Sequence, residues 1–193
     1  RNSLFAGPVP RDIWRFYRYD WIEEYGVPGL NRSEQLHVMD ALKRLGCTRC
    51  EKVGFSKVTN QREGEALRRS LSQLLEGGVL ALVVNYLDHL THGRSELELL
   101  RDLAPDVQGF RRLVSTWFES SFLKDLLHTL SARGATVVVT SDHGSVLCNR
   151  PSPVKGARGM SSSVRYRLGH ALSADEKAAV IVRDAARWGL PDD

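Results

Sequence analysis

The pattern of hydrophobic and polar positions predicts strands that alternate with helices along most of the chain. Two runs of apolar or β-branched residues, Val79–Tyr86 and Thr136–Thr140, are typical of strands buried on both faces of a parallel sheet. Weaker candidate strands cover Glu51–Lys57, Val164–Arg167 and Ala179–Val182. We therefore expect an α/β fold with a mainly parallel sheet that is flanked by helices.

Amphipathic spacing predicts helices between these strands. We expect capped starts at Asn60 and Asp106, a capping box that joins Ser95 to Glu98, and a glycine stop at Gly46. The expected helices cover Asp12–Tyr25, Ser33–Leu45, residues 60–76, a segment from Ser95 to Pro105, a segment from Asp106 through Trp117, and Phe122–Leu130.

The predicted strand at Thr136–Thr140 ends in Ser141, Asp142 and His143, which bring an acid and an imidazole together. Both side chains are good ligands for a divalent transition metal. On a continuing strand they would point to opposite faces, but Gly144 lets the backbone turn so that both can approach one point. Functional groups in open α/β sheets gather at the carboxyl ends of strands, so this corner is a candidate active site.

The strand that begins at Val79 is also followed by two polar side chains, Asp88 and His92. If the chain is helical here, these two residues stand four apart on one helical face and could bind one ion. Either pair alone is a weak signal; together, each at the exit of a buried strand, they favour a metal site. His89 would face away from the ion, and we interpret it as structural.

Length and composition indicate one soluble globular domain over residues 1–193. The chain has 193 residues, 42% of them hydrophobic and 26% charged, which suits a single core. No apolar run approaches the ~20 residues of a membrane span, and the amino end lacks a signal-peptide pattern. Three cysteines, among them the pair of a lone Cys47-x-x-Cys50, do not make a disulfide framework. We expect a cytoplasmic protein.

The net charge of +4 is modest, but the basic residues are unevenly placed. No acidic residue occurs from His143 to Ala174, whereas Arg158 and Arg165 fall in that stretch together with Arg150, Lys155 and Arg167. A solvated basic loop is the simpler interpretation. The position just after the Asp-His corner favours an anionic substrate, particularly a phosphate ester. No motif typical of a general nucleic-acid surface accompanies the run.

Several motifs occur in a specific order from one end of the chain to the other. They are Arg1–Gly7, Asn85–Asp88, His92–Arg94, Leu103–Asp106, Ser115–Phe118, Thr140–Gly144, Val164–Arg167 and Gly189–Pro191. On these motifs the chain resembles the PglZ branch of the alkaline phosphatase superfamily, and within it the output domain of PorX-type response regulators. The resemblance implies an alkaline phosphatase-like core, of which this chain would hold an incomplete part.

The resemblance also implies a two-metal site. Asp142 and His143 would ligate one ion and Asp88 and His92 the other, with Zn²⁺ expected and Mn²⁺ as an alternative. It further implies a Thr nucleophile upstream of Arg1 and a third His beyond Pro191. We therefore expect a fragment that begins and ends inside the catalytic domain and is inactive alone, although its parent is an enzyme.

Four residues are candidates for contacts with substrate. Asn85 and Arg94 flank the second metal pair, where they could touch phosphate or the groups behind the ligands. Arg158 and Arg165 match basic positions of the family that the chain resembles.

Two functions from different classes remain open. The first is a phosphodiesterase or phosphatase, on nucleotide or cyclic-oligonucleotide substrates, serving as the output domain of a two-component regulator. Its implied partners are a receiver domain in the same chain and a sigma factor-like or sensor kinase protein, with no membrane, and a homodimer is left open. The second is a non-catalytic module that keeps the fold and binds a ligand or partner. The four visible metal ligands favour the enzyme.

Overall fold

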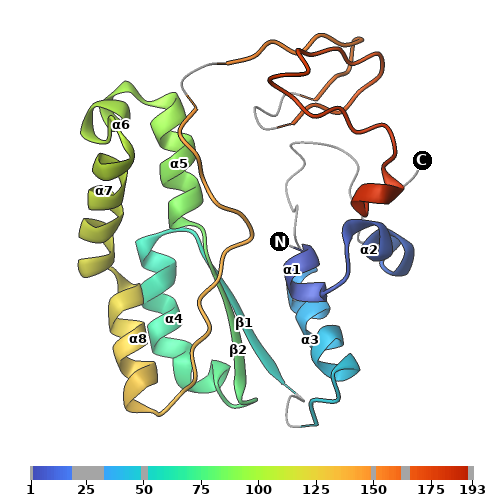
Figure 1. Ribbon diagram of the computed structural model, residues 1–193. Helices are drawn as coiled ribbons and strands as arrows, with labels where there is room; N and C mark the ends of the chain where they lie inside the picture. The colour runs from blue at the N-terminus through green and yellow to red at the C-terminus, as the bar shows by residue number, and fades with distance from the viewer. Residues whose placement is uncertain (1, 19–32, 49–51, 149–150, 162–165, 191–193) are drawn as a thin grey trace. The chain divides into compact units, whose positions relative to one another are not determined.

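The computed structural model describes residues 2–18, 33–48, 52–148, 151–161 and 166–190 (Figure 1). The chain divides into two compact units, which we describe separately. The sheet unit is Gln35–Leu147, and the terminal unit combines Arg1–Glu34 with Cys148–Asp193. The single domain expected over residues 1–193 stays a prediction.

The sheet unit is built on a β-α-β element. Strands β1 (Val53–Val58) and β2 (Val79–Val84) pair in parallel, from Val53 opposite Val79 to Val58 opposite Val84. Helix α4 (Gln61–Leu74) connects them, as parallel strands require a crossover. The α/β fold class with a parallel sheet is confirmed, and both strands lie close to the predicted ranges.

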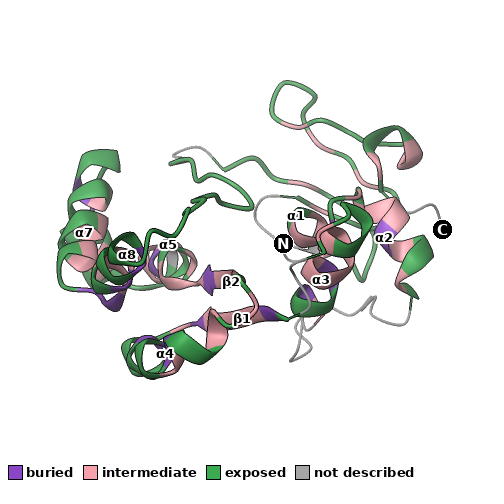
Figure 2. Cartoon of the chain, turned by 90° about the horizontal axis from the view of Figure 1, so that it is seen from below, coloured by how far each residue is buried: buried purple, intermediate pink, exposed green. Residues whose placement is uncertain are grey.

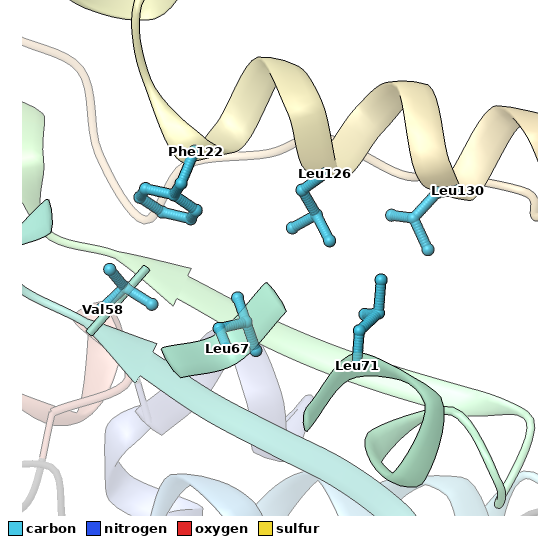
Figure 3. Packing of buried hydrophobic residues seen from close by; sticks show 6 residues of the cluster. All are labelled: Val58, Leu67, Leu71, Phe122, Leu126 and Leu130. Atoms are coloured by element: carbon cyan, nitrogen blue, oxygen red, sulfur yellow. The ribbon is translucent and has the colours of Figure 1, made fainter. Parts of the chain in front are cut away.

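A single hydrophobic core joins this element to helix α8 (Phe122–Ala132). Three residues of α8 at successive i,i+4 positions point toward side chains of α4 and β1 (Figure 3). The buried cluster consists of Val58, Leu67, Leu71, Phe122, Leu126 and Leu130. Burial of these apolar surfaces is the main force that holds α4 and α8 together.

Four more helices belong wholly or mainly to the sheet unit. They are α3 (Glu34–Arg44), α5 (Tyr86–Glu96), α6 (Glu98–Leu103) and α7 (Val107–Glu119). From α5 onward each helix packs against the next, and α8 returns to α4 (Figure 1). Helix α5 therefore links the carboxyl end of β2 to the rest of the helical layer.

Two of the three predicted helix N-caps are confirmed. The side chain of Asn60 accepts a hydrogen bond from the Glu63 N–H, and that of Asp106 accepts one from the Gly109 N–H. The capping box at Ser95 is wrong, because α5 continues through Glu96 and the next helix has Leu97 at its N-cap.

The expected strand at Thr136–Thr140 is not formed. The segment runs exposed from the end of α8, as the green trace in Figure 2 shows, and Val138 and Val139 are each 84% exposed. Ala179–Val182 is likewise no strand. β-Branched residues favour an extended chain, but a strand also needs a hydrogen-bonded neighbour, and within the described ranges neither segment has a strand partner.

The terminal unit is held by short elements: helices α1 (Asn2–Ala6) and α2 (Pro10–Phe16) and the 3-10 helix η2 (Ala186–Trp188). The helix expected at Asp12–Tyr25 begins earlier, since Pro10 occupies its first turn. It ends at Phe16, and the part of the prediction from Tyr19 onward lies outside the described residues.

A loop of the terminal unit brings Lys155 and Ser173 together in an isolated antiparallel bridge. The strand expected at Val164–Arg167 lies half outside the described residues, and Tyr166 and Arg167 are not in a strand. None of the described helices has the length and apolar character to cross a membrane.

Candidate metal-binding site

The first candidate pair, Asp88 and His92, lies on helix α5 directly beyond the sheet. The Asn85 N–H donates to the Val58 carbonyl (2.9 Å), which fixes the end of β2 against β1. His89 N–H then donates to the Asn85 carbonyl (3.0 Å) as the helix begins. The predicted helical spacing of Asp88 and His92 is confirmed.

These two side chains are arranged so that an ion could lie between them. Asp88 Oδ1 and His92 Nε2 are 3.9 Å apart. Two donors of a tetrahedral zinc site lie about 3.3 Å from each other, given metal–ligand bonds of about 2.0–2.1 Å. A small side-chain rotation closes that difference, and the pair fits a divalent ion as two of its ligands.

The second candidate pair, Asp142 and His143, has the same spacing on an exposed extended segment. Asp142 Oδ1 and His143 Nε2 are 3.9 Å apart. His143 Nδ1 lies 3.0 Å from the Gly144 carbonyl oxygen, and the Ser141 hydroxyl donates to the His143 carbonyl (2.8 Å). A carbonyl can only accept, so Nδ1 carries the proton and Nε2 keeps a lone pair for a ligand.

The structure does not bring the two pairs into one cluster. Within the described part of the chain, no three His, Cys, Asp or Glu side chains are close enough to hold an ion together. Each pair is therefore a two-donor half-site, whereas a catalytic zinc ion takes three protein ligands. The joint site expected from the sequence stays a prediction.

Arg94 has a structural role in the sheet unit. Its Nε donates to the Ala104 carbonyl (2.6 Å) and its Nη2 to the Pro105 carbonyl (2.8 Å). These bonds satisfy carbonyls at the end of α6 and tie α5 to the start of α7. The substrate contact expected of Arg94 would have to coexist with both bonds.

The other substrate-side candidates are placed in different parts of the chain. Asn85 stands at the N-cap of α5, between β2 and the Asp88–His92 pair. Arg158 is exposed in the terminal unit. Arg165 lies outside the described residues.

The sequence did not predict an aromatic contact at the first residue of α5. Tyr86 and Trp117 stack with ring centroids 3.9 Å apart and planes 7° from parallel. Burial raises the pKa of the Tyr86 phenol above its ordinary value. The inward spacing of Trp117 on its helix was a signal for packing, but the identity of its partner depends on the tertiary structure.

The mixed α/β fold and its short parallel sheet agree with an alkaline phosphatase-like domain. A family model described as the BREX system PglZ alkaline phosphatase-like domain matches residues 27–193. The match covers most of the chain and both Asp-His pairs, and the chain belongs to the PglZ family. No curated protein matches the chain.

Proposed function

We propose that the chain contributes to a metal-dependent phosphoester hydrolase with two divalent ions, Zn²⁺ first and Mn²⁺ as an alternative. The observation that carries the proposal is the repeated geometry of Asp88 with His92 and of Asp142 with His143, each with carboxylate and imidazole 3.9 Å apart. Membership of an alkaline phosphatase-like family supports this class of reaction.

In this proposal the protein's own groups hold and orient the ions. Two bound ions would stabilise the charge on the attacking and leaving oxygens of a phosphoester. Asp142 and His143 would hold one of them, with the Gly144 carbonyl keeping the imidazole in the tautomer that leaves Nε2 free. Asp88 and His92 would hold the other.

A common site requires the segment Thr136–Thr140 to move onto the sheet. It runs in the same sense as β2, from the end of α8 toward the level of α5 (Figure 1). Pairing with β2 would bury Val138 and Val139 and carry Asp142 to the carboxyl edge of the sheet, where α5 begins. We propose that this docking assembles the site.

The substrate and biological role are finer parts of the same proposal. Motifs such as Asn85–Asp88 and Ser115–Phe118 resemble PorX-type output domains, so we propose nucleotide or cyclic-oligonucleotide phosphoesters as substrates and a response regulator as the setting. A receiver domain in cis and a sigma factor-like or sensor kinase partner would follow from that role.

One observation favours a second candidate, a module that binds a ligand or partner without turnover. The two Asp-His pairs are separate half-sites in the described part of the chain, and such half-sites would bind metal weakly. The module would keep the α/β fold and use its surface instead.

Metal content and hydrolysis of a chromogenic phosphodiester distinguish the two functions. The experiment compares this chain and any longer natural protein that contains it with Asp142→Ala and His92→Ala, and with His170→Ala as an exposed-histidine control. The hydrolase predicts about two ions per wild-type chain, fewer in both site variants and unchanged binding in the control. A folded longer protein without bound metal or turnover would leave the binding module standing.

A further inference from the structure

Helix α5 has an anchored face, which packs against neighbouring residues, and an opposite face that carries Asp88 and His92. Leu90 is buried, and a Cβ on Gly93 would lie 3.0 Å from the Leu100 side chain, so this face packs closely. At about 100° per residue, Tyr86 and Arg94 lie near the same face. Asp88 and His92 lie on roughly the opposite side, and the contacts of the anchored face therefore decide where the pair points.

The first turn of α5 follows β2 directly, and the Asn85 N–H joins it to the Val58 carbonyl of β1. Its N-cap, Asn85, makes no side-chain capping hydrogen bond. The side chain of Tyr86, the first residue of the helix, stacks on Trp117 of α7. At the other end Arg94 is held by two carbonyls, so α5 is fastened on both sides of the Asp88–His92 pair.

Metal binding by Asp88 and His92 is sensitive to the rotation of α5 about its axis. Ligand atoms stand roughly 6 Å from a helix axis, so a rotation of about 10° moves them by about 1 Å. Metal–ligand distances tolerate about ±0.2 Å. A small turn of α5 about its axis would therefore shift Asp88 and His92 together by more than this tolerance, relative to an ion shared with other ligands.

We propose that Trp117 is a positioning residue for the Asp88–His92 pair, because its stack on Tyr86 sets the rotation of the first turn of α5. Offset or stacked aromatic pairs contribute about 0.5–1.5 kcal/mol beyond the burial of their surfaces. The expected effect of Trp117 on metal affinity rests on the proposed function. Its effect on the position of α5 does not.

The test compares Trp117→Phe, which keeps an aromatic ring, with Trp117→Leu, which fills space without a stack. Leu130→Ala serves as the control, since it weakens the α4–α8 core, against which Trp117 also packs, without removing the stack on Tyr86. Two readouts are needed: Co²⁺ affinity from its ligand-field absorption, and amide hydrogen exchange at His89–Gly93.

For Trp117→Leu we expect Co²⁺ binding at least about tenfold weaker, the scale of losses from residues that orient ligands. Exchange at His89–Gly93 should also become faster, beyond the general change seen in Leu130→Ala. Trp117→Phe should stay near the wild type in both. Equal Co²⁺ affinity and equal exchange in Trp117→Leu and the wild type would overturn the proposal, as would an identical response in Leu130→Ala.

His92→Ala separates this proposal from the proposed function. If the wild type binds Co²⁺ no better than His92→Ala, the metal function fails. Exchange at His89–Gly93 then still decides whether Trp117 holds the helix, and faster exchange confined to Trp117→Leu upholds that part.

Discussion

His143 Nδ1 lies 3.0 Å from the carbonyl oxygen of Gly144, the next residue in the chain. Because the carbonyl can only accept a hydrogen bond, the neutral imidazole carries its proton on Nδ1. The unprotonated nitrogen, Nε2, is then on the side of Asp142, whose Oδ1 is 3.9 Å away. The imidazole of His143 therefore has a lone pair on Nε2, although the segment that carries it is exposed.

This relationship predicts the nitrogen chemical shifts of His143. In the neutral imidazole we expect Nδ1 to be the protonated nitrogen and Nε2 the one whose chemical shift changes when Zn²⁺ is added. Long-range nitrogen–proton NMR spectra of labelled protein measure both, and His143→Gln assigns the signals. A ring with the proton on Nε2 would contradict the prediction.

Replacing Arg94 should reduce stability before it affects any reaction. Arg94→Ala leaves the Ala104 and Pro105 carbonyls without their guanidinium donors, and we expect a loss of about 1–3 kcal/mol in unfolding free energy. Urea unfolding measures it. Arg101→Ala, an exposed arginine on α6, should change stability by less than about 0.5 kcal/mol. An unchanged stability with a raised KM would instead favour a substrate contact by Arg94.

The core between α4 and α8 should respond strongly to truncation. Leu126 is 1% exposed and lies in the centre of the cluster, so Leu126→Ala should cost about 2–5 kcal/mol through lost burial and a residual cavity. Leu99 on α6 is 69% exposed, and Leu99→Ala should change stability little. Denaturant midpoints at equal m-value compare them. Similar losses of stability in both variants would contradict the assignment of Leu126 to the hydrophobic core.

Acid stability should depend on Glu63 at the start of α4. The Thr59 backbone N–H first, then the Thr59 hydroxyl and the Asn60 amide, bond to its carboxylate and lower its pKa below 4.5. A lowered folded-state pKa adds stability above the unfolded value, and this stability disappears as pH falls through the folded value.

The variant Glu63→Gln should therefore lose stability at neutral pH and lose less than the wild type on acidification below pH 4.5. Unfolding midpoints against pH make the comparison. Glu65→Gln, on an exposed position of the same helix, is the control. The same acid response in wild type and Glu63→Gln would contradict the prediction.

Alkaline titration should detect the burial of Tyr86 beside Trp117. Burial raises the pKa of its phenol above 10, so the unfolded chain releases this proton first and stability falls as pH rises beyond 10. Phenolate absorbance should show a late-titrating component that is lost in Tyr86→Phe. Tyr166→Phe, at a more exposed phenol, should leave the late component in place.

Local sequence signals predicted most helices and both observed strands well. Asn60 and Asp106 accept hydrogen bonds from amides three residues ahead, a distance that the chain itself sets. The apolar spacing of Leu67 and Leu71 likewise places both on the inner face of α4. Ser95 shows the limit of such signals, because α5 continues past it and packs against α6.

Some features of the candidate site likewise follow from the sequence alone. The sequence by itself determined the spacing of Asp88 and His92, since four residues on a helix bring two side chains together whatever surrounds them. It also determined that Asp142 and His143 meet beside Gly144. Family membership, too, follows from the sequence.

Only the tertiary structure decided which residues hold these elements in place. The stack of Tyr86 on Trp117 and the bonds from Arg94 to Ala104 and Pro105 join different elements of the chain. The unpaired state of Thr136–Thr140 was decided at that level as well, because β-branched residues specify an extended backbone but cannot specify its neighbour. Contacts between distant segments depend on how whole elements pack, and no local pattern encodes that.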